Sequence, residues 1–241
     1  MFNYKIKLEY NGKNFQGSQA QNGPELIRTV QSELESALER FFKEKIESNF
    51  AGRTDAGVHA IGQVANFKLN QDLGDLTQNP DKLLISLNAH LPEDVVITKI
   101  ESVPLDFHAR FSARAREYIY KIFIRRHRPV LRLDSLMWHK GHLDFDKMSA
   151  QAKTYLGHHD FKNFSKTDDG ENTMCNVMDS ELIKESEICY KYRIKADRFL
   201  RHMVRRIVGE LIQVGSYNTS SQPLSLKTVP AEGLTLIKVY Y

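Results

Sequence analysis

The chain is poor in cysteine and has no long apolar run. Two cysteines, Cys175 and Cys189, occur among its 241 residues, and neither belongs to the clustered Cys and His spacing that is typical of a zinc site. Two isolated thiols argue against a disulfide framework and fit a reducing compartment. No stretch approaches the roughly 18 apolar residues that would indicate a membrane span.

The N-terminal segment also lacks the pattern of a secretory signal. Met1 to Tyr10 alternates apolar with polar and charged residues, whereas a signal peptide has a charged start followed by an apolar run. Metal-ligand patterns are equally weak, because His59 stands alone and the pair His158 and His159 has no acidic partner motif. We therefore expect a soluble protein of the cytoplasm, with no membrane association and no bound metal.

A strong excess of one charge is missing as well. With 34 Lys and Arg against 30 Asp and Glu, the formal net charge is +4, which is weak support for a nucleic-acid partner. The arginines are nevertheless clustered, and arginine both forks onto phosphate and stacks on bases. The three clusters are Arg110, Arg114 and Arg116; Arg125, Arg126, His127, Arg128 and Arg132; and Arg198, Arg201, His202, Arg205 and Arg206. One cluster alone would indicate a solvated face, whereas three favour RNA or DNA.

Hydrophobic periodicity predicts an α+β protein with two similar halves, residues 1–104 and 105–241. In the first half, the alternation predicts strands at 2–10, 63–67 and 95–103, and prolines open two helices. The first helix would begin at Pro24, run for about 18 residues and carry an apolar stripe from Leu26 to Phe41. The second helix would begin at Pro80.

The second half repeats this alternation of strand and helix without detectable sequence repetition. We expect a strand at 118–124, a helix from Asp144 to Leu156 closed by Gly157, a hairpin of 174–184 with 188–197, an apolar helical face from Phe199 onward, and a last strand at 234–240. The hairpins favour mainly antiparallel sheets flanked by helices over a doubly wound parallel sheet.

The segment from Ala51 to Ala60 places Arg53, Asp55 and His59 between two glycines. This composition suits neither helix nor strand and is typical of a turn whose backbone approaches a ligand. An aspartate in such a turn is often only a turn-former. As a site, it offers one carboxylate whose ionised form the nearby Arg53 favours, which suits a nucleophile or an electrostatic stabiliser rather than a general acid. A glycosidase would need a second carboxylate, and the sequence shows no obvious one.

Seven motifs in order resemble those of the tRNA pseudouridine synthase A (TruA) family. The turn resembles the family signature G-R-T-D-x-G-V-H, with the aspartate at Asp55. The other matching segments are Leu8-Glu9-Tyr10-Asn11-Gly12 with Phe15-x-Gly17; Thr29-Val30-Gln31; Gly62-Gln63-Val64-Ala65; Phe107 to Ala113 with Arg116-x-Tyr118-x-Tyr120; Phe199-Leu200-x-x-Met203-Val204-Arg205; and Pro230-Ala231-x-Gly233-Leu234. Together they cover nearly the whole chain.

The resemblance implies the pseudouridine synthase fold, with a catalytic cleft between the halves, and a cofactor-free isomerase. Such an enzyme cuts the uracil base from C1′ at N1, turns it and rejoins it through C5, so no metal or nucleotide is required. It further implies a homodimer that binds tRNA and modifies positions 38, 39 and 40 of the anticodon stem-loop. A pseudouridine synthase for ribosomal or another RNA, and a noncatalytic RNA-binding protein on the same scaffold, are the alternatives.

The resemblance also implies roles for single residues. Asp55 would supply the essential carboxylate, Arg205 would pair with it and keep it ionised, and Tyr118 would stack on the target uracil. Arg53 would fill the space left by the flipped nucleotide or hold its phosphate, and Leu234 would close the pocket. Packing is the alternative for the two tyrosines, preferred for Tyr120, and His59 is interpreted as a structural turn residue. The basic residues expected to bind RNA are Arg110, Arg114, Arg198 and Arg201.

The chain departs from the family pattern at Ser18. Family members commonly carry Trp after the glycine of the opening segment, and the single Trp of this chain is Trp138. We interpret the difference as affecting an RNA contact or packing near residues 15–20 rather than the chemistry.

Overall fold

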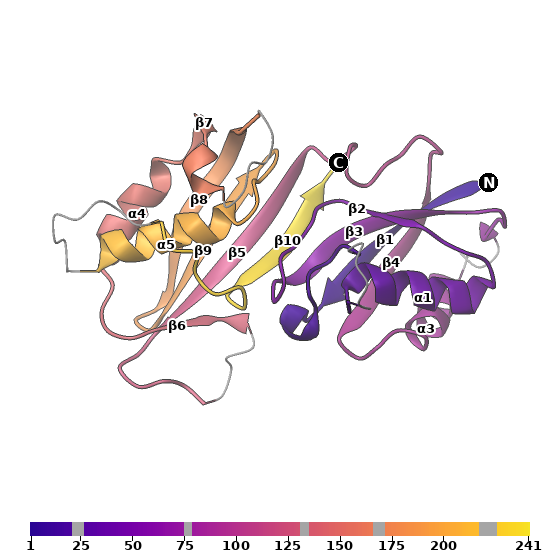
Figure 1. Ribbon diagram of the computed structural model, residues 1–241, viewed down its shortest axis with the longest axis horizontal. Helices are drawn as coiled ribbons and strands as arrows, with labels where there is room; N and C mark the ends of the chain where they lie inside the picture. The colour runs from indigo at the N-terminus through magenta and orange to yellow at the C-terminus, as the bar shows by residue number, and fades with distance from the viewer. Residues whose placement is uncertain (21–26, 75–78, 131–134, 166–171, 217–225) are drawn as a thin grey trace. The chain divides into compact units, whose positions relative to one another are not determined.

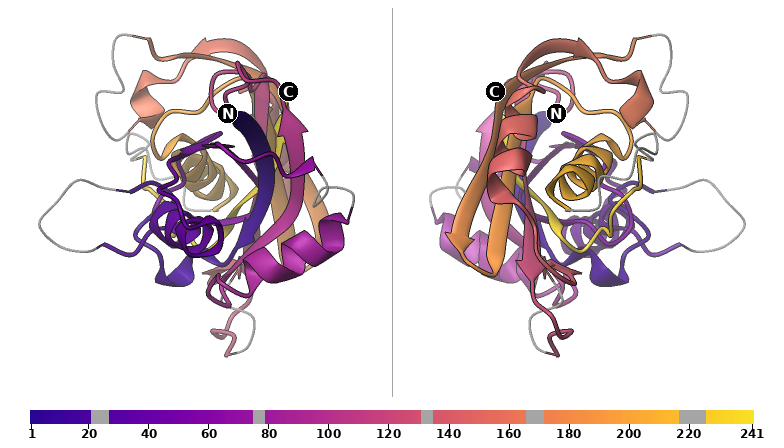
Figure 2. Two further views of the ribbon diagram at one scale, coloured as in Figure 1. Left: turned by 90° about the vertical axis from the view of Figure 1, so that its right-hand side faces the viewer. Right: turned by 90° about the vertical axis from the view of Figure 1, so that its left-hand side faces the viewer.

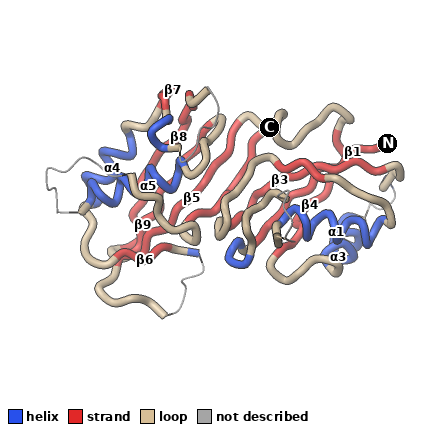
Figure 3. The backbone as a smooth tube through the Cα atoms, viewed as in Figure 1, coloured by secondary structure: helices blue, strands red, loops and turns tan. Residues whose placement is uncertain are grey.

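A computed structural model describes residues 1–20, 27–74, 79–130, 135–165, 172–216 and 226–241 (Figure 1). The chain divides into two compact units. Residues 1–114 and 236–241 form the first unit, and residues 115–235 form the second. The tube in Figure 3 shows strands and helices in both units. The predicted α+β class is confirmed.

In its described residues, the first unit contains an antiparallel sheet and the helices α1 and α3. Its elements are β1 (Phe2–Tyr10), the short 3-10 helix η1 (Gly12–Asn14), α1 (Val30–Phe42), β2 (Ser48–Phe50), β3 (His59–Leu69), α3 (Pro80–Asn88) and β4 (Val95–Val103). The strands follow the order β4-β1-β3, with β2 paired to β3. Alternation in β1 buries Tyr4, Ile6, Leu8 and Tyr10 on one face, as the period of two predicts.

The sequence placed the start of the first helix too early. Residues 27–29 are not helical, α1 begins at Val30, and Pro24 and Leu26 lie outside the described residues. A capping box sets the start: the Thr29 side chain accepts from the Ser32 amide, and the Ser32 hydroxyl accepts from the Thr29 amide. These bonds satisfy donors that a helix start leaves free, whereas a proline only permits a start.

The second unit is also mainly antiparallel. Its elements are β5 (Ala115–Ile124), β6 (Met137–His139), α4 (Phe145–Lys153), β7 (Gly157–Asp160), the 3-10 helix η3 (Lys162–Phe164), β8 (Met174–Ser186), β9 (Cys189–Ala196) and α5 (Met203–Gly215). The order is β5-β9-β8-β7, and β6 pairs with β5 in parallel. Both views in Figure 2 show α5 to one side of the strands of this unit, and α4 packs against α5 and β8.

Two helices of the second unit have different boundaries from those predicted. Asp144 is the N-cap of α4, which ends at Lys153, and Gly157 begins β7 instead of closing the helix. Helix α5 begins at Met203 because its cap, His202, has a left-handed backbone with φ of 65°. The apolar residues Phe199 and Leu200 therefore precede the helix. The short strands β6 and β7 were not predicted.

The last strand, β10 (Leu234–Tyr240), contributes to both units. Leu236 to Tyr241 belong to the first unit, where the carbonyl of Ile237 lies so close to Gly62 of β3 that a Cβ at Gly62 would overlap it. Glycine in the Gly62-Gln63-Val64-Ala65 motif is thus a requirement of strand packing. Among the described helices, none is long and apolar enough to cross a membrane.

Candidate active site

Asp55 lies in a hydrogen-bonded turn of the first unit, between β2 and β3. Its carbonyl accepts a bond from the Val58 amide at 3.1 Å, and Gly57 in the turn has φ of 81°. The Asp55 side chain is half-buried and Arg53, two residues earlier, is exposed. The expected turn is confirmed, and its glycine takes up a backbone angle that other residues adopt only at a cost.

Thr54, directly before Asp55, is held by all three of its polar groups. Its amide donates to the Ser18 hydroxyl at 2.8 Å, and its carbonyl accepts from the Ser18 amide at 3.1 Å. Its own hydroxyl is hydrogen-bonded to the Tyr10 hydroxyl at 2.8 Å. Thr54, Ser18 and Tyr10 are all buried.

Gln63 of β3 fixes the other side of the turn. Its amide nitrogen donates to the Gly52 carbonyl at 2.9 Å and to the Tyr10 hydroxyl at 3.3 Å, and its oxygen accepts from the Val64 amide. The Ala51 amide donates to the Val64 carbonyl at 2.8 Å. Backbone and side-chain bonds therefore join the start of the turn to the sheet.

His59 was interpreted as a structural turn residue. Its structural role agrees with its burial and hydrogen bonding, but it lies in strand β3 and not in the turn. His59 is the buried first residue of β3, and its Nδ1 accepts from the Gly12 amide at 3.1 Å. Gly12 packs against the Val58 backbone so closely that a Cβ would overlap it. A hydrogen bond between Gly12 and His59 therefore joins the opening motif to the motif of the Asp55 turn.

The expected RNA contacts of the first unit have exposed side chains. Arg110 and Arg114 are exposed, like Arg53. Arg110 lies over the ring of Phe111, 5.5 Å from its centroid, and Phe111 is 76% exposed. These arginines are accessible to a phosphate backbone.

Tyr118 lies on β5 of the second unit, on the same buried face as Tyr120. Its ring meets Phe199 edge to face, with centroids 5.2 Å apart. Tyr120 is fully buried, and its hydroxyl donates to the Pro230 carbonyl at 2.8 Å. The packing role preferred for Tyr120 agrees with this position.

Arg205 and Tyr120 hold the segment that leads to Leu234. The Arg205 Nε donates to the Val229 carbonyl at 2.8 Å, one residue before the acceptor of Tyr120. Burial raises the pKa of the Tyr120 hydroxyl, and the charge of Glu232 adds to the rise while that of Arg205 opposes it. Leu234 is buried at the start of β10. Within the second unit, Arg205 and Leu234 are thus structurally linked.

The third arginine cluster divides into two kinds of residue. Arg201 is exposed and Arg198 is half-buried in the turn before α5. Arg206, in contrast, donates to the carbonyls of Asn163 and Ser165 next to η3. Arg206 therefore has a structural role, which the sequence pattern did not distinguish from that of the residues expected to bind RNA.

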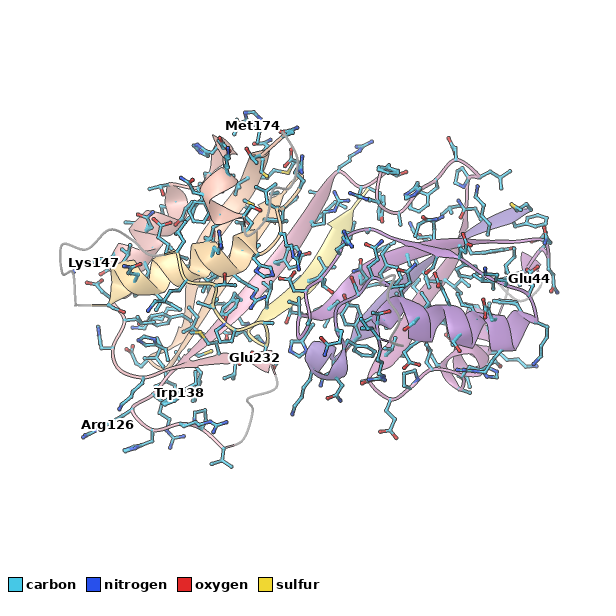
Figure 4. All side chains as sticks on the ribbon, in the orientation of Figure 1. Glu44, Arg126, Trp138, Lys147, Met174 and Glu232 are labelled. Atoms are coloured by element: carbon cyan, nitrogen blue, oxygen red, sulfur yellow. The ribbon has the colours of Figure 1, made fainter. Side chains whose placement is uncertain are left out.

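The second arginine cluster follows β5. Arg125, Arg126, His127 and Arg128 are exposed, and Arg132 lies outside the described residues. The Trp138 indole donates to the Arg125 carbonyl at 2.8 Å, and Figure 4 labels Trp138 and Arg126 in this region. Across the described ranges, no group of three or more His, Cys, Asp or Glu is placed to hold a metal ion.

A family model described as tRNA pseudouridine synthase matches residues 7–112 and 151–241. The chain belongs to the tRNA pseudouridine synthase family. Membership in this family makes it an isomerase. The tRNA pseudouridine synthase A of Dictyoglomus thermophilum is 40% identical, with 100% of both chains covered. The tRNA pseudouridine synthase A of Shigella boydii is 37% identical over 99% of this chain and 90% of that one.

In this member of the tRNA pseudouridine synthase family, sequence reasoning missed the residues that hold the Asp55 turn. The serine at position 18 was interpreted as affecting an RNA contact or packing near residues 15–20 rather than the chemistry. In the structure, Ser18 is fully buried and bonded twice to Thr54, directly before Asp55. Tyr10 and Gln63 stood in the matching motifs without an assigned role. Both residues carry polar groups, lie in strands and belong to the matching motifs, and this combination was the signal that could have identified them.

Proposed function

We propose that this enzyme converts uridine to pseudouridine at positions 38, 39 and 40 of tRNA, with Asp55 as the essential carboxylate. The observation that carries the proposal is the Asp55 turn, which presents a half-buried carboxylate beside the exposed Arg53 and is held in place by buried hydrogen bonds. A carboxylate held in one geometry avoids the entropic cost of being ordered during the reaction.

The reaction replaces the carbon–nitrogen bond between base and sugar by a carbon–carbon bond. The N1–C1′ bond breaks, the base turns within the pocket, and C5 bonds to C1′ while the C5 proton passes to solvent and N1 becomes protonated. Atoms and electrons balance without a cofactor. Asp55 provides a negative charge next to the sugar. Its carboxylate either stabilises positive charge at C1′ or acts as a nucleophile there.

The remaining roles extend the family resemblance to particular side chains. We assign Tyr118 to stacking on the flipped uracil, Arg53 to the vacated stack or its phosphate, and Arg205 and Leu234 to the pocket. Four arginines bind the RNA backbone: Arg110, Arg114, Arg198 and Arg201. The exposed positions of Arg53, Arg110, Arg114 and Arg201 support the phosphate contacts.

The proposal includes a cytoplasmic homodimer that acts on tRNA. Two cysteines, Cys175 and Cys189, are too few for a disulfide framework, which fits a reducing compartment. The dimer is inferred from the family resemblance and is tested by measuring the mass of the protein in solution with and without tRNA.

Replacing the carboxylate tests the chemical assignment. Asp55→Asn keeps the shape of the side chain and removes its charge, so we expect pseudouridine formation in purified tRNA to be abolished while the Kd for tRNA changes less than about threefold. Pseudouridine is mapped at single-nucleotide resolution in tRNA and in ribosomal RNA after incubation with each variant.

The exposed carboxylate Asp81, on α3, provides the matched control. Asp81→Asn should form product at the wild-type rate. Product formation by Asp55→Asn contradicts the catalytic role, and product found in ribosomal RNA but not at tRNA positions 38 to 40 contradicts the proposed substrate.

A further inference from the structure

Hydrogen bonds restrain Thr54, the residue directly before Asp55. The amide, carbonyl and hydroxyl of Thr54 are each hydrogen-bonded inside the first unit. On the other side of Asp55, its carbonyl closes the turn to Val58. A shift of Thr54 therefore changes the direction of the Asp55 side chain directly.

Ser18 connects this site to helix α1. While its hydroxyl and amide bind Thr54, its carbonyl accepts from the Gln31 amide at 2.9 Å, in the first turn of α1. Gly17, with φ of 107°, brings the segment so close that a Cβ would lie 3.0 Å from the Thr54 carbonyl oxygen. A serine hydroxyl is small enough for this fully buried contact.

Tyr10 connects the site to β1 and, through Gln63, to β3. Its hydroxyl contacts Thr54 and the Gln63 amide, and 3% of the residue is exposed. Burial raises the pKa of this hydroxyl to about 12, so Tyr10 remains neutral and retains its proton for the hydrogen bonds across the working range of the enzyme. Buried polar networks of this kind are rigid only when their members are satisfied.

We propose that Tyr10 and Ser18 are positioning residues that set the direction of the Asp55 carboxylate through Thr54. The inference rests on the proposed role of Asp55. Both residues are buried and act by restraining the backbone. A misplacement of about 1 Å in a reacting group costs up to roughly 100-fold in rate.

The test compares Tyr10→Phe with Tyr4→Phe. Both tyrosines lie on β1 and are buried, and each substitution removes only a hydrogen-bonded hydroxyl. The Tyr4 hydroxyl, however, bonds to Asp72 and to the Leu73 amide, away from the turn. We expect Tyr10→Phe to reduce the single-turnover rate of pseudouridine formation about 10- to 100-fold, with the Kd for tRNA within about twofold. Tyr4→Phe should keep the wild-type rate.

Variants of Thr54 identify the bond through which Tyr10 acts. Thr54→Val keeps the shape but removes the hydroxyl, and it should slow the reaction as much as Tyr10→Phe, with no further loss in the double variant. Thr54→Ser keeps the hydroxyl and should retain most of the rate. Ser18→Ala should slow the reaction without weakening tRNA binding.

Amide hydrogen exchange supplies a readout that does not depend on activity. Tyr10→Phe should accelerate exchange at the Thr54 and Val58 amides, and Tyr4→Phe should not. A wild-type rate together with wild-type exchange in Tyr10→Phe overturns the inference, as does an equal loss of rate in Tyr4→Phe. If the wild-type protein forms no pseudouridine, the proposed function fails, while the exchange data still decide whether Tyr10 holds the turn.

Discussion

Arg28 is held by two carboxylates and an aromatic ring. Its guanidinium makes a two-pronged contact with Asp94, with both bonds at 2.8 Å, and its Nε donates to Glu33 at 2.8 Å. The guanidinium also lies 4.2 Å from the centroid of Phe15. The Arg28 side chain is 36% exposed and that of Asp94 20%, so solvent weakens the pair, while the forked geometry favours it.

Asp94→Asn should destabilise the protein in a pH-dependent way. The Arg28 hydrogen bonds hold the pKa of the Asp94 carboxyl below its usual 3.8, so the carboxylate stabilises the fold above that value and ceases to do so as pH falls through the lower folded pKa. We expect a loss of about 1 kcal/mol in the free energy of unfolding at neutral pH. Urea unfolding between neutral pH and about pH 3 should show the difference from wild type shrinking.

Asp106→Asn, at an exposed position, is the control and should change stability little at any pH. A constant difference between Asp94→Asn and wild type across the pH range would mean that the charge of Asp94 does not stabilise the fold.

The turn at Asp55 was predictable from sequence, but the residues that support it were not. An aspartate and an arginine between glycines are typical of a turn. Ser18, by contrast, is 36 positions from Thr54 in sequence. No local pattern indicates from which distant amide a serine hydroxyl will accept a hydrogen bond. Long-range hydrogen bonds depend on the packing of whole elements, which single-residue chemistry does not contain.

Strands were predicted more accurately than helix ends. The expected ranges 2–10, 95–103 and 234–240 match β1, β4 and β10, because alternating burial leaves a clear period of two. Helices α1 and α5 were predicted to begin too early, and α4 was predicted to end too late. Their ends are set by the capping interactions of Thr29 and Asp144 and by the left-handed backbone of His202, which an apolar stripe does not reveal.

Gly62→Ala should destabilise the first unit where β3 meets β10. The added methyl group would overlap the Ile237 carbonyl, and backbone cannot move aside as cheaply as a side chain, so we expect a loss of about 1 to 3 kcal/mol in the free energy of unfolding. Urea unfolding of the purified variant measures it.

Gly74→Ala is the comparison, since among the described atoms a Cβ there would meet the Asp72 side chain, at an ordinary 3.5 Å. Wild-type stability in Gly62→Ala would show that β3 and β10 separate without cost.

The molecule as a whole carries little net charge, +4, so its affinity for RNA depends on where the arginines lie. Neutralising phosphates releases counterions, and log Kd should therefore vary linearly with log salt concentration. Arg201→Gln, at an exposed position before α5, should weaken tRNA binding and reduce the magnitude of that slope by about one. Fluorescence anisotropy with labelled tRNA at several salt concentrations measures both.

Arg40→Gln removes an arginine that donates to Ser36 and to the His90 carbonyl on the first unit, and its salt slope should equal that of the wild type. An unchanged slope in Arg201→Gln would show that Arg201 makes no phosphate contact.

The division of β10 between the two units has a consequence for synthesis. The first unit needs residues 236–241 in addition to residues 1–114, and residues 236–241 are translated only after residues 115–235. Chains usually fold from the N-terminal end while they emerge from the ribosome. Here the N-terminal unit has to wait, with the edge of β3 uncovered beside Gly62, until the entire second unit has been made. A ribosome stalled shortly before residue 236 should therefore carry a first unit that proteases still cut.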